Sequence, residues 1–201
     1  MDLLVPDWNQ PRPSADDVLE MCRRIELKRL ATPNGPFERF LSTVREKYDN
    51  GGAYLNSFEV GTDGVFDWFA SRNRLWDDRL LDRLVLHPAI VEAFPELCIP
   101  VEPKDGNGFG MFDQFLLDGS LANMIYNGGA YSQASGNGRA EKEFALEVCD
   151  AMFGLRYGEV SCNMNYDAWT PWFKGIAWDL TAVMFDRRFR KLWMFAATDT
   201  D

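Results

Sequence analysis

The residue types best suited to acid–base or metal chemistry are scattered along the chain. They are the single histidine His87 and a set of acids, namely Asp63, Asp67, Asp113, Asp179 and Asp199. Asp179 stands inside an apolar run, where catalytic acids are often found; alternatively, it faces solvent or pairs with an arginine of residues 187–190. His87 would have to be the base of any Ser–His or Cys–His mechanism, but it precedes Pro88 at an element boundary. We therefore predict no catalytic residue and no metal site.

Two glycine-rich loops, residues 106–110 and 136–138, raise the question of a phosphate-binding site. A phosphate cradle needs backbone N–H groups at the start of a helix, and dinucleotide sites also need a preceding strand. Gly138 does precede a predicted helix, but Glu141 and Glu143 would place negative charge where the phosphate should bind. We interpret both segments as plain loops and predict no cofactor.

A five-residue motif, Asn-Gly-Gly-Ala-Tyr, occurs at residues 50–54 and again at residues 127–131. The flanking sequences do not continue the similarity, so the motif does not indicate a repeat fold. Glycine tolerates positive φ and tyrosine anchors a loop on apolar surface. We interpret the two copies as Gly-Gly turns that are each followed by an anchoring tyrosine.

Aromatic residues gather between positions 166 and 178, where Trp169 and Trp172 lie in a proline-containing connection. Tryptophan serves as an anchor in protein interfaces when it is exposed and fills the core when it is buried. For Trp169 and Trp172 both interpretations stay open. Trp178 and Trp193 fall within predicted strands, and we expect them in the core.

A basic turn follows this aromatic segment and carries Arg187, Arg188, Arg190 and Lys191. The chain has 21 Lys and Arg residues against 31 Asp and Glu residues, and four of the basic residues are concentrated in this turn. Such a turn either contacts an acidic partner or the acidic surface of its own chain, or it is simply solvated, which is the ordinary state of a charged turn.

The composition indicates an acidic globular protein. The chain has 201 residues and a formal net charge of −10, so it repels nucleic acid and anionic membranes and favours basic partners. The four cysteines are far apart and show no zinc-site spacing, and no apolar run is long enough to cross a membrane. We expect one domain over residues 1–201, located in the reducing cytoplasm.

The fold class follows from where the periodic segments lie. Helical periodicity and end signals predict helices from Ser14 to about Leu30, from Pro36 to Tyr48 and from Ala140 to Phe153, among shorter ones. A strand from Val160 to Tyr166 and a C-terminal β-hairpin around residues 186–191 complete the chain. We predict an α+β fold, in which a mainly helical N-terminal two-thirds packs on one face of a small antiparallel sheet.

In overall character the chain resembles bacterial immunity proteins, which neutralise a cognate toxin. The shared features are small size, strong acidity, several tryptophans and no catalytic signature; no motif is shared, so no family residue is transferred. The resemblance implies a non-enzymatic protein that blocks a basic toxin domain by charge and shape. The alternatives are a hydrolase or metal-dependent enzyme that uses Asp179 or His87, and a phage-associated or other assembly protein whose oligomeric state the sequence leaves open.

The resemblance directs attention to exposed aromatic and acidic residues near the glycine-rich loops, together with the basic turn. The predicted partner contacts are Trp169, Trp172, Asp105, Asp113, Glu141, Glu143, Arg187, Arg188 and Arg190.

Overall fold

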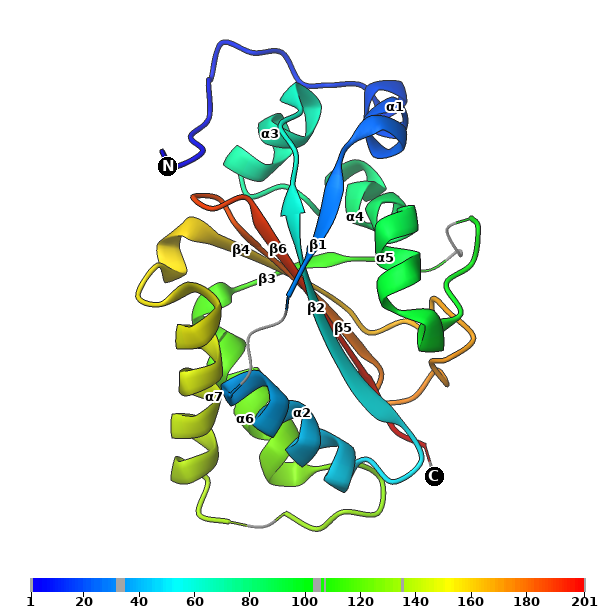
Figure 1. Cartoon of the computed structure of the whole chain (residues 1–201), viewed down its shortest axis with the longest axis vertical. Coiled ribbons are helices and arrows are strands. Elements are labelled where there is room, and N and C mark those ends of the chain that lie inside the picture. Colours follow the sequence, from blue (N-terminus) through cyan, green and yellow to red (C-terminus); the bar gives the residue numbers. More distant parts are fainter. Residues whose placement is uncertain (1, 32–34, 103–105, 107, 135, 201) are drawn as a thin grey trace.

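An antiparallel sheet crosses the centre of the molecule in the computed structural model, which describes residues 2–31, 35–102, 106, 108–134 and 136–200 (Figure 1). The order of its strands is β1-β2-β6-β5-β4-β3. The strands are β1 Leu27–Leu30, β2 Gly52–Val60, β3 Gly110–Phe112, β4 Val160–Asn165, β5 Leu180–Asp186 and β6 Lys191–Thr198. The last three form the predicted antiparallel meander, which ends in the β5–β6 hairpin. The predicted α+β class is confirmed.

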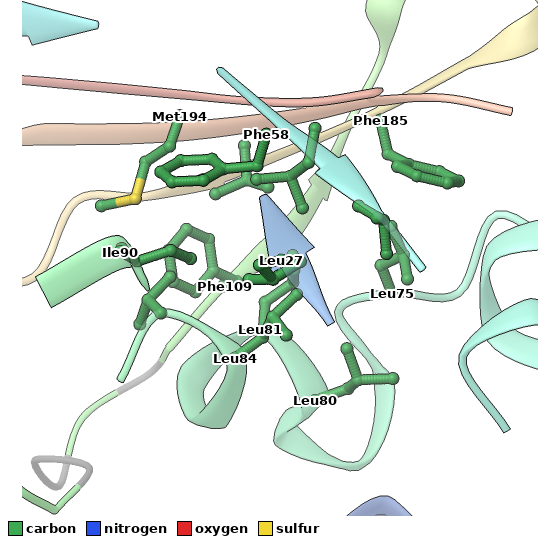
Figure 2. Packing of buried hydrophobic residues seen from close by; sticks show 14 of the residues in the cluster. Leu27, Phe58, Leu75, Leu80, Leu81, Leu84, Ile90, Phe109, Phe185 and Met194 are labelled. Carbon is green, nitrogen blue, oxygen red and sulfur yellow. The ribbon is translucent and has the colours of Figure 1, made fainter. Parts of the chain in front are cut away.

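Helices cover both faces of this sheet, and each face carries its own hydrophobic core. Alternate residues of β6 show the division, because Trp193 lies in one core and Met194 in the other. The first core, part of which is drawn in Figure 2, includes side chains of α1, α3, α4 and α5. The second core includes those of α2, α6 and α7 (Figure 1). Our expectation of helices on one face is therefore wrong. A strand whose side chains are apolar on both faces of the sheet needs other elements packed against both faces.

The ends of some of the helices carry residue types that are typical of caps. They are α1 Ala15–Arg24, α2 Pro36–Lys47, α3 Gly64–Ser71, α4 Leu80–Leu84, α5 Pro88–Ala93, α6 Leu117–Asn127 and α7 Arg139–Phe153, with 3₁₀ turns η1 Asp77–Arg79, η2 Pro95–Leu97, η3 Gln114–Leu116 and η4 Tyr157–Glu159. Ser14 and Asp17 form a reciprocal capping box at the start of α1. Gly154 ends α7 with a φ of 58°, as its position after an amphipathic helix predicts.

The sequence prediction is wrong at the N-terminal side of the sheet. Helix α1 ends at Arg24, and Leu27–Leu30 instead pairs with β2 as the edge strand β1. β2 itself was not predicted, although it is the longest strand described here and lies between β1 and β6. Its glycine-rich start indicated a loop, and its buried polar residues Asn56 and Ser57 obscured the alternation. Trp178 precedes β5 and is partly buried, whereas Trp193 is buried in β6 as expected.

Candidate functional site

Asp179 closes the turn that leads into β5. Its carboxylate accepts hydrogen bonds from the backbone N–H groups of Lys174, Gly175 and Ile176, at 3.0, 2.6 and 3.2 Å, and from the hydroxyl of Thr198. The side chain is 1% exposed, so it does not face solvent, and two arginines of the basic turn pair with other acids. These contacts give Asp179 a structural role, because several oriented donors satisfy a buried charge.

Asp199 joins the two copies of the Asn-Gly-Gly-Ala-Tyr motif. One carboxylate oxygen accepts from the backbone N–H of Asn50 at 3.0 Å, and the other accepts from that of Ala130 at 2.7 Å. A Cβ on Gly129 would lie 1.9 Å from this carboxylate, so only glycine fits there. Asp199 is fully buried and therefore ties the α2–β2 and α6–α7 loops to the C-terminal strand. We call Asp179, Asp199 and their donors the aspartate clamp.

His87 caps the N-terminus of α5. One ring nitrogen accepts from the backbone N–H of Ala89 at 3.2 Å, and the other lies 3.1 Å from the carbonyl oxygen of Ile25, to which it donates in the neutral tautomer. Burial lowers the pKa of His87, and the bond to Ile25 partly offsets this effect. Both residues of the enzyme alternative thus serve local structure. In the described part of the chain, no three His, Cys, Asp or Glu side chains gather as a metal site requires.

The basic turn is directed at its own chain. Arg187 donates to the carbonyl oxygens of Ser71, Gly158 and Glu159; Arg188 pairs with the Glu159 carboxylate; Arg190 donates to the carbonyls of Val60 and Gly61 and pairs with Asp67. The turn therefore fastens the hairpin to the segments around it. This arrangement matches the alternative in which its charges meet the acidic surface of the same molecule.

The two candidate tryptophans differ in exposure. Trp169 is buried, and its indole N–H donates to the hydroxyl of Thr181 at 2.8 Å, so it belongs to the first core. Trp172 is half-buried and contacts Tyr54 and Phe173 edge-on. The open question is thus decided for Trp169 in favour of the core, while Trp172 keeps some accessible surface.

The predicted acidic contacts do not come together in one place. Asp105 lies outside the described residues. Asp113 is exposed and caps η3, where its carboxylate accepts from Phe115 at 2.9 Å. Glu141 and Glu143 lie on α7, on the second-core side, and Glu143 pairs with Arg139 at 2.8 Å. Glu141 and Glu143 therefore lie with the second core, whereas Trp169 and Trp172 pack with the first core.

A different group of residues does form a hollow, of about 440 Å³, where β2 extends past the end of β1. We call it the edge groove. The middle of β2 lies between α2 on one side and α5 with η2 on the other. Its lining residues are Arg29, Phe37, Glu38, Leu41, Arg45, Tyr54, Leu55, Asn56, Glu92, Ala93, Pro95 and Glu96.

Hydrogen bonds hold the polar lining of the edge groove in place. Arg29 donates to the side-chain oxygen of Asn56 at 2.7 Å, and the amide nitrogen of Asn56 donates to the carbonyl of Ala93 at 2.9 Å. Arg45 donates to the carbonyl of Ala53 at 2.9 Å. These bonds connect β1, β2, α2 and α5, so the groove is a built feature of the fold.

Three carboxylates around the groove, those of Glu38, Glu92 and Glu96, are exposed. Among the described residues none of them forms an ion pair, whereas the two lining arginines are already hydrogen-bonded. Burial, and next the nearby Glu96 carboxylate, raise the pKa of Tyr54. The edge groove therefore combines three exposed carboxylates with two arginines that keep their charge, because the acceptors on Asn56 and Ala53 are neutral.

Sequence reasoning missed this site because its acids come from α2 and from the α5–η2 region, which are distant in sequence. The buried polar residues Asn56 and Ser57 obscured the alternation of β2, so there was no clear local signal for a strand beside α2. Comparison with known proteins gives no match to any family model, curated protein or solved structure. In the described part of the chain, no helix has the length and apolar character needed to cross a bilayer.

Proposed function

We propose that the chain is a non-enzymatic inhibitor of the bacterial immunity type, which binds and neutralises a basic toxin domain through the edge groove. The observation that carries this proposal is the set of three exposed glutamates around a 440 Å³ hollow, none of which forms an ion pair within the part of the chain that the structure describes. Structural ion pairs elsewhere use their acids within the molecule, as Asp67 and Glu159 do. Among the described residues the groove acids form no such pair; other exposed acids, such as Glu59 and Asp150, form none either, but the three groove acids share one hollow.

Charge supports the same function at long range. A net charge of −10 attracts a basic domain before contact and raises the association rate at low ionic strength. The groove glutamates then fix the orientation of the bound partner, and they disfavour an acidic partner, whose charges they would repel. Residues such as Trp172 and Tyr54, which lie beside the groove, add apolar contact area.

We place this function in the cytoplasm, where thiols stay reduced. All four cysteines are free. Burial raises the pKa of Cys149 and of Cys162 to about 12, so both persist as thiols at neutral pH.

The test uses the protein encoded beside this chain in its genome, since toxin and immunity genes are neighbours. Co-expression of the wild-type chain is expected to relieve growth inhibition by that protein. The Glu92→Lys/Glu96→Lys double variant is expected to lose protection. The matched control, Glu20→Lys/Asp150→Lys, carries the same change in net charge at exposed sites on α1 and α7 and should protect fully. Equal protection by both variants, or none by wild type, would refute the proposal.

A further inference from the structure

The aromatic segment and the second Asn-Gly-Gly-Ala-Tyr copy meet at another hollow of the molecule. Tyr166 and Trp178 come from the connection between β4 and β5, and Asn127 and Gly128 come from the end of α6. With neighbouring residues they line a hollow of about 270 Å³, close to the lower end of the range for small-molecule sites. We call it the amide pocket. In the described part of the chain, it shares no lining residue with the edge groove.

Helix α6 supplies the hydrogen-bonding groups of the amide pocket. Ser120, Asn123 and Asn127 recur at helical spacing, so they lie on one face of the helix. The amide nitrogen of Asn127 donates to the side-chain oxygen of Asn123 at 2.7 Å, which orients both side chains. Among the described residues, nothing else bonds the amide nitrogen of Asn123, which is a donor, or the side-chain oxygen of Asn127, which is an acceptor. The pocket therefore presents a donor and an acceptor side by side.

Two aromatic rings also line the pocket. Tyr166 is 58% exposed, and its hydroxyl donates to the sulfur of Met164 at 3.1 Å, which holds the ring. Trp178 is partly buried just before β5. The face of an aromatic ring carries partial negative charge and attracts the polarised C–H groups of a ring that lies against it. The pocket thus combines apolar faces with directed polar groups.

The described lining of the amide pocket offers no unsatisfied charge. Both carboxylate oxygens of Asp179 are occupied, one by three backbone N–H groups and the other by the hydroxyl of Thr198. Burial raises the pKa of Tyr166 and raises the pKa of Tyr48 to about 12, so both phenols are neutral at pH 7. The net charge of −10 repels anionic ligands, including nucleotides. A neutral ligand suits this pocket best.

The aspartate clamp holds two sides of the pocket in place. Asp179 accepts from the backbone of residues 174–176, in the turn that carries Trp178. Asp199 accepts from the N–H of Ala130, shortly after α6, at 2.7 Å. Groups that are fixed before binding lose little conformational freedom when a ligand arrives. The pocket is therefore suited to a small, rigid ligand.

We propose that the amide pocket binds one ring of a neutral hexopyranose. Such a sugar has a C–H face for Tyr166 or Trp178, and its adjacent hydroxyls both donate and accept, as the amide groups require. The volume suits a single ring rather than a peptide segment. This site goes beyond the proposed inhibition and does not depend on it.

The test titrates the full, isotope-labelled chain with the methyl glycosides of glucose, galactose, mannose and N-acetylglucosamine, followed by nuclear magnetic resonance. At least one glycoside should shift the side-chain amide signals of Asn123 and Asn127 and the indole signal of Trp178, with a Kd of about 1 mM, as ligand size predicts. Asn123→Ala should raise this Kd about fivefold or more. Asn9→Ala, the same change at an exposed site on the N-terminal segment, should not. Both variants should melt with wild type, because exposed side chains contribute little to stability.

The outcomes separate the sugar site from the inhibition. Absence of shifts with all four glycosides would overturn the sugar site, and so would equal Kd values for Asn123→Ala and Asn9→Ala. Binding of adenosine but of no glycoside would assign the aromatic faces to a base and would likewise overturn it. Glu92→Lys/Glu96→Lys should bind the glycoside as wild type does, while the growth assay with the neighbouring protein judges inhibition independently.

Discussion

The aspartate clamp and the edge groove contain the same functional group in opposite situations. In the clamp, Asp179 and Asp199 are at most 1% exposed, and backbone N–H groups or a hydroxyl satisfy their oxygens. In the groove, Glu38, Glu92 and Glu96 are exposed, and no ion pair forms to them among the described residues. The clamp carboxylates therefore stabilise the fold, and the groove carboxylates are available for binding.

This difference shows why acidity by itself does not locate a site. A buried carboxylate needs several donors to offset its desolvation, and those donors fix its role as structural. An exposed carboxylate without a partner contributes little to stability. The accessible charge of this molecule is therefore to be sought where the fold leaves acids unpaired.

The largest expected effect is at the clamp. Replacement of Asp199 by Ala leaves the buried N–H groups of Asn50 and Ala130 without an acceptor, so the free energy of unfolding should fall by about 3 kcal/mol. Urea denaturation followed by circular dichroism measures this change. A loss below about 1 kcal/mol would show that the clamp does not hold the loops.

The glycines of the first motif copy provide a matched pair. A Cβ on Gly51 would lie 1.7 Å from the carbonyl oxygen of Thr198, whereas one on Gly52 would make an ordinary 3.5 Å contact with Trp172. Gly51→Ala should cost about 2–3 kcal/mol, and Gly52→Ala less than about 1 kcal/mol. Equal melting temperatures for the two variants would contradict the close approach of the motif to the C-terminal strand.

The groove should respond in the opposite way. Replacing Glu38, Glu92 and Glu96 together by Gln removes three exposed charges that form no ion pair with any residue in the described ranges. The free energy of unfolding should change by less than about 0.5 kcal/mol per site. A loss comparable to that of Asp199→Ala would assign these glutamates to the fold and remove the contrast between the two regions.

His87 sharpens the contrast through pH. Burial lowers the pKa of His87 in the folded state, so the unfolded chain binds the proton more readily. The contribution of neutral His87 to the free energy of unfolding is therefore complete above about pH 6.5 and declines as the pH falls below that value. His87→Asn keeps a capping acceptor but does not titrate. Its stability should therefore fall less between pH 7.5 and pH 5 than that of wild type. His87 lines another hollow, separate from the edge groove, and the titratable or charged residues around it are the same in both proteins: Cys22, Arg23, Arg83 and Glu102. Parallel stability curves would contradict the assigned role.

The sequence predicted the elements whose signals are local. Helices α2 and α7 have clear apolar faces, and the β5–β6 hairpin has two apolar runs around a polar turn. β1 and β2 were missed, because Leu27–Leu30 continues a helical pattern and is made a strand by pairing with β2. The edge groove depends on the same tertiary event, which places Leu55 beside glutamates of α5 and η2. A pattern search along one chain has no local signal for such a site.

The most direct test of the division between clamp and groove is calorimetric titration of the neighbouring gene's protein with the Glu92→Lys/Glu96→Lys variant. We predict that the Kd rises at least tenfold over wild type while the melting temperature stays within about 2 °C. The Glu20→Lys/Asp150→Lys control should match wild type in both measurements. An unchanged Kd for the groove variant would contradict the account.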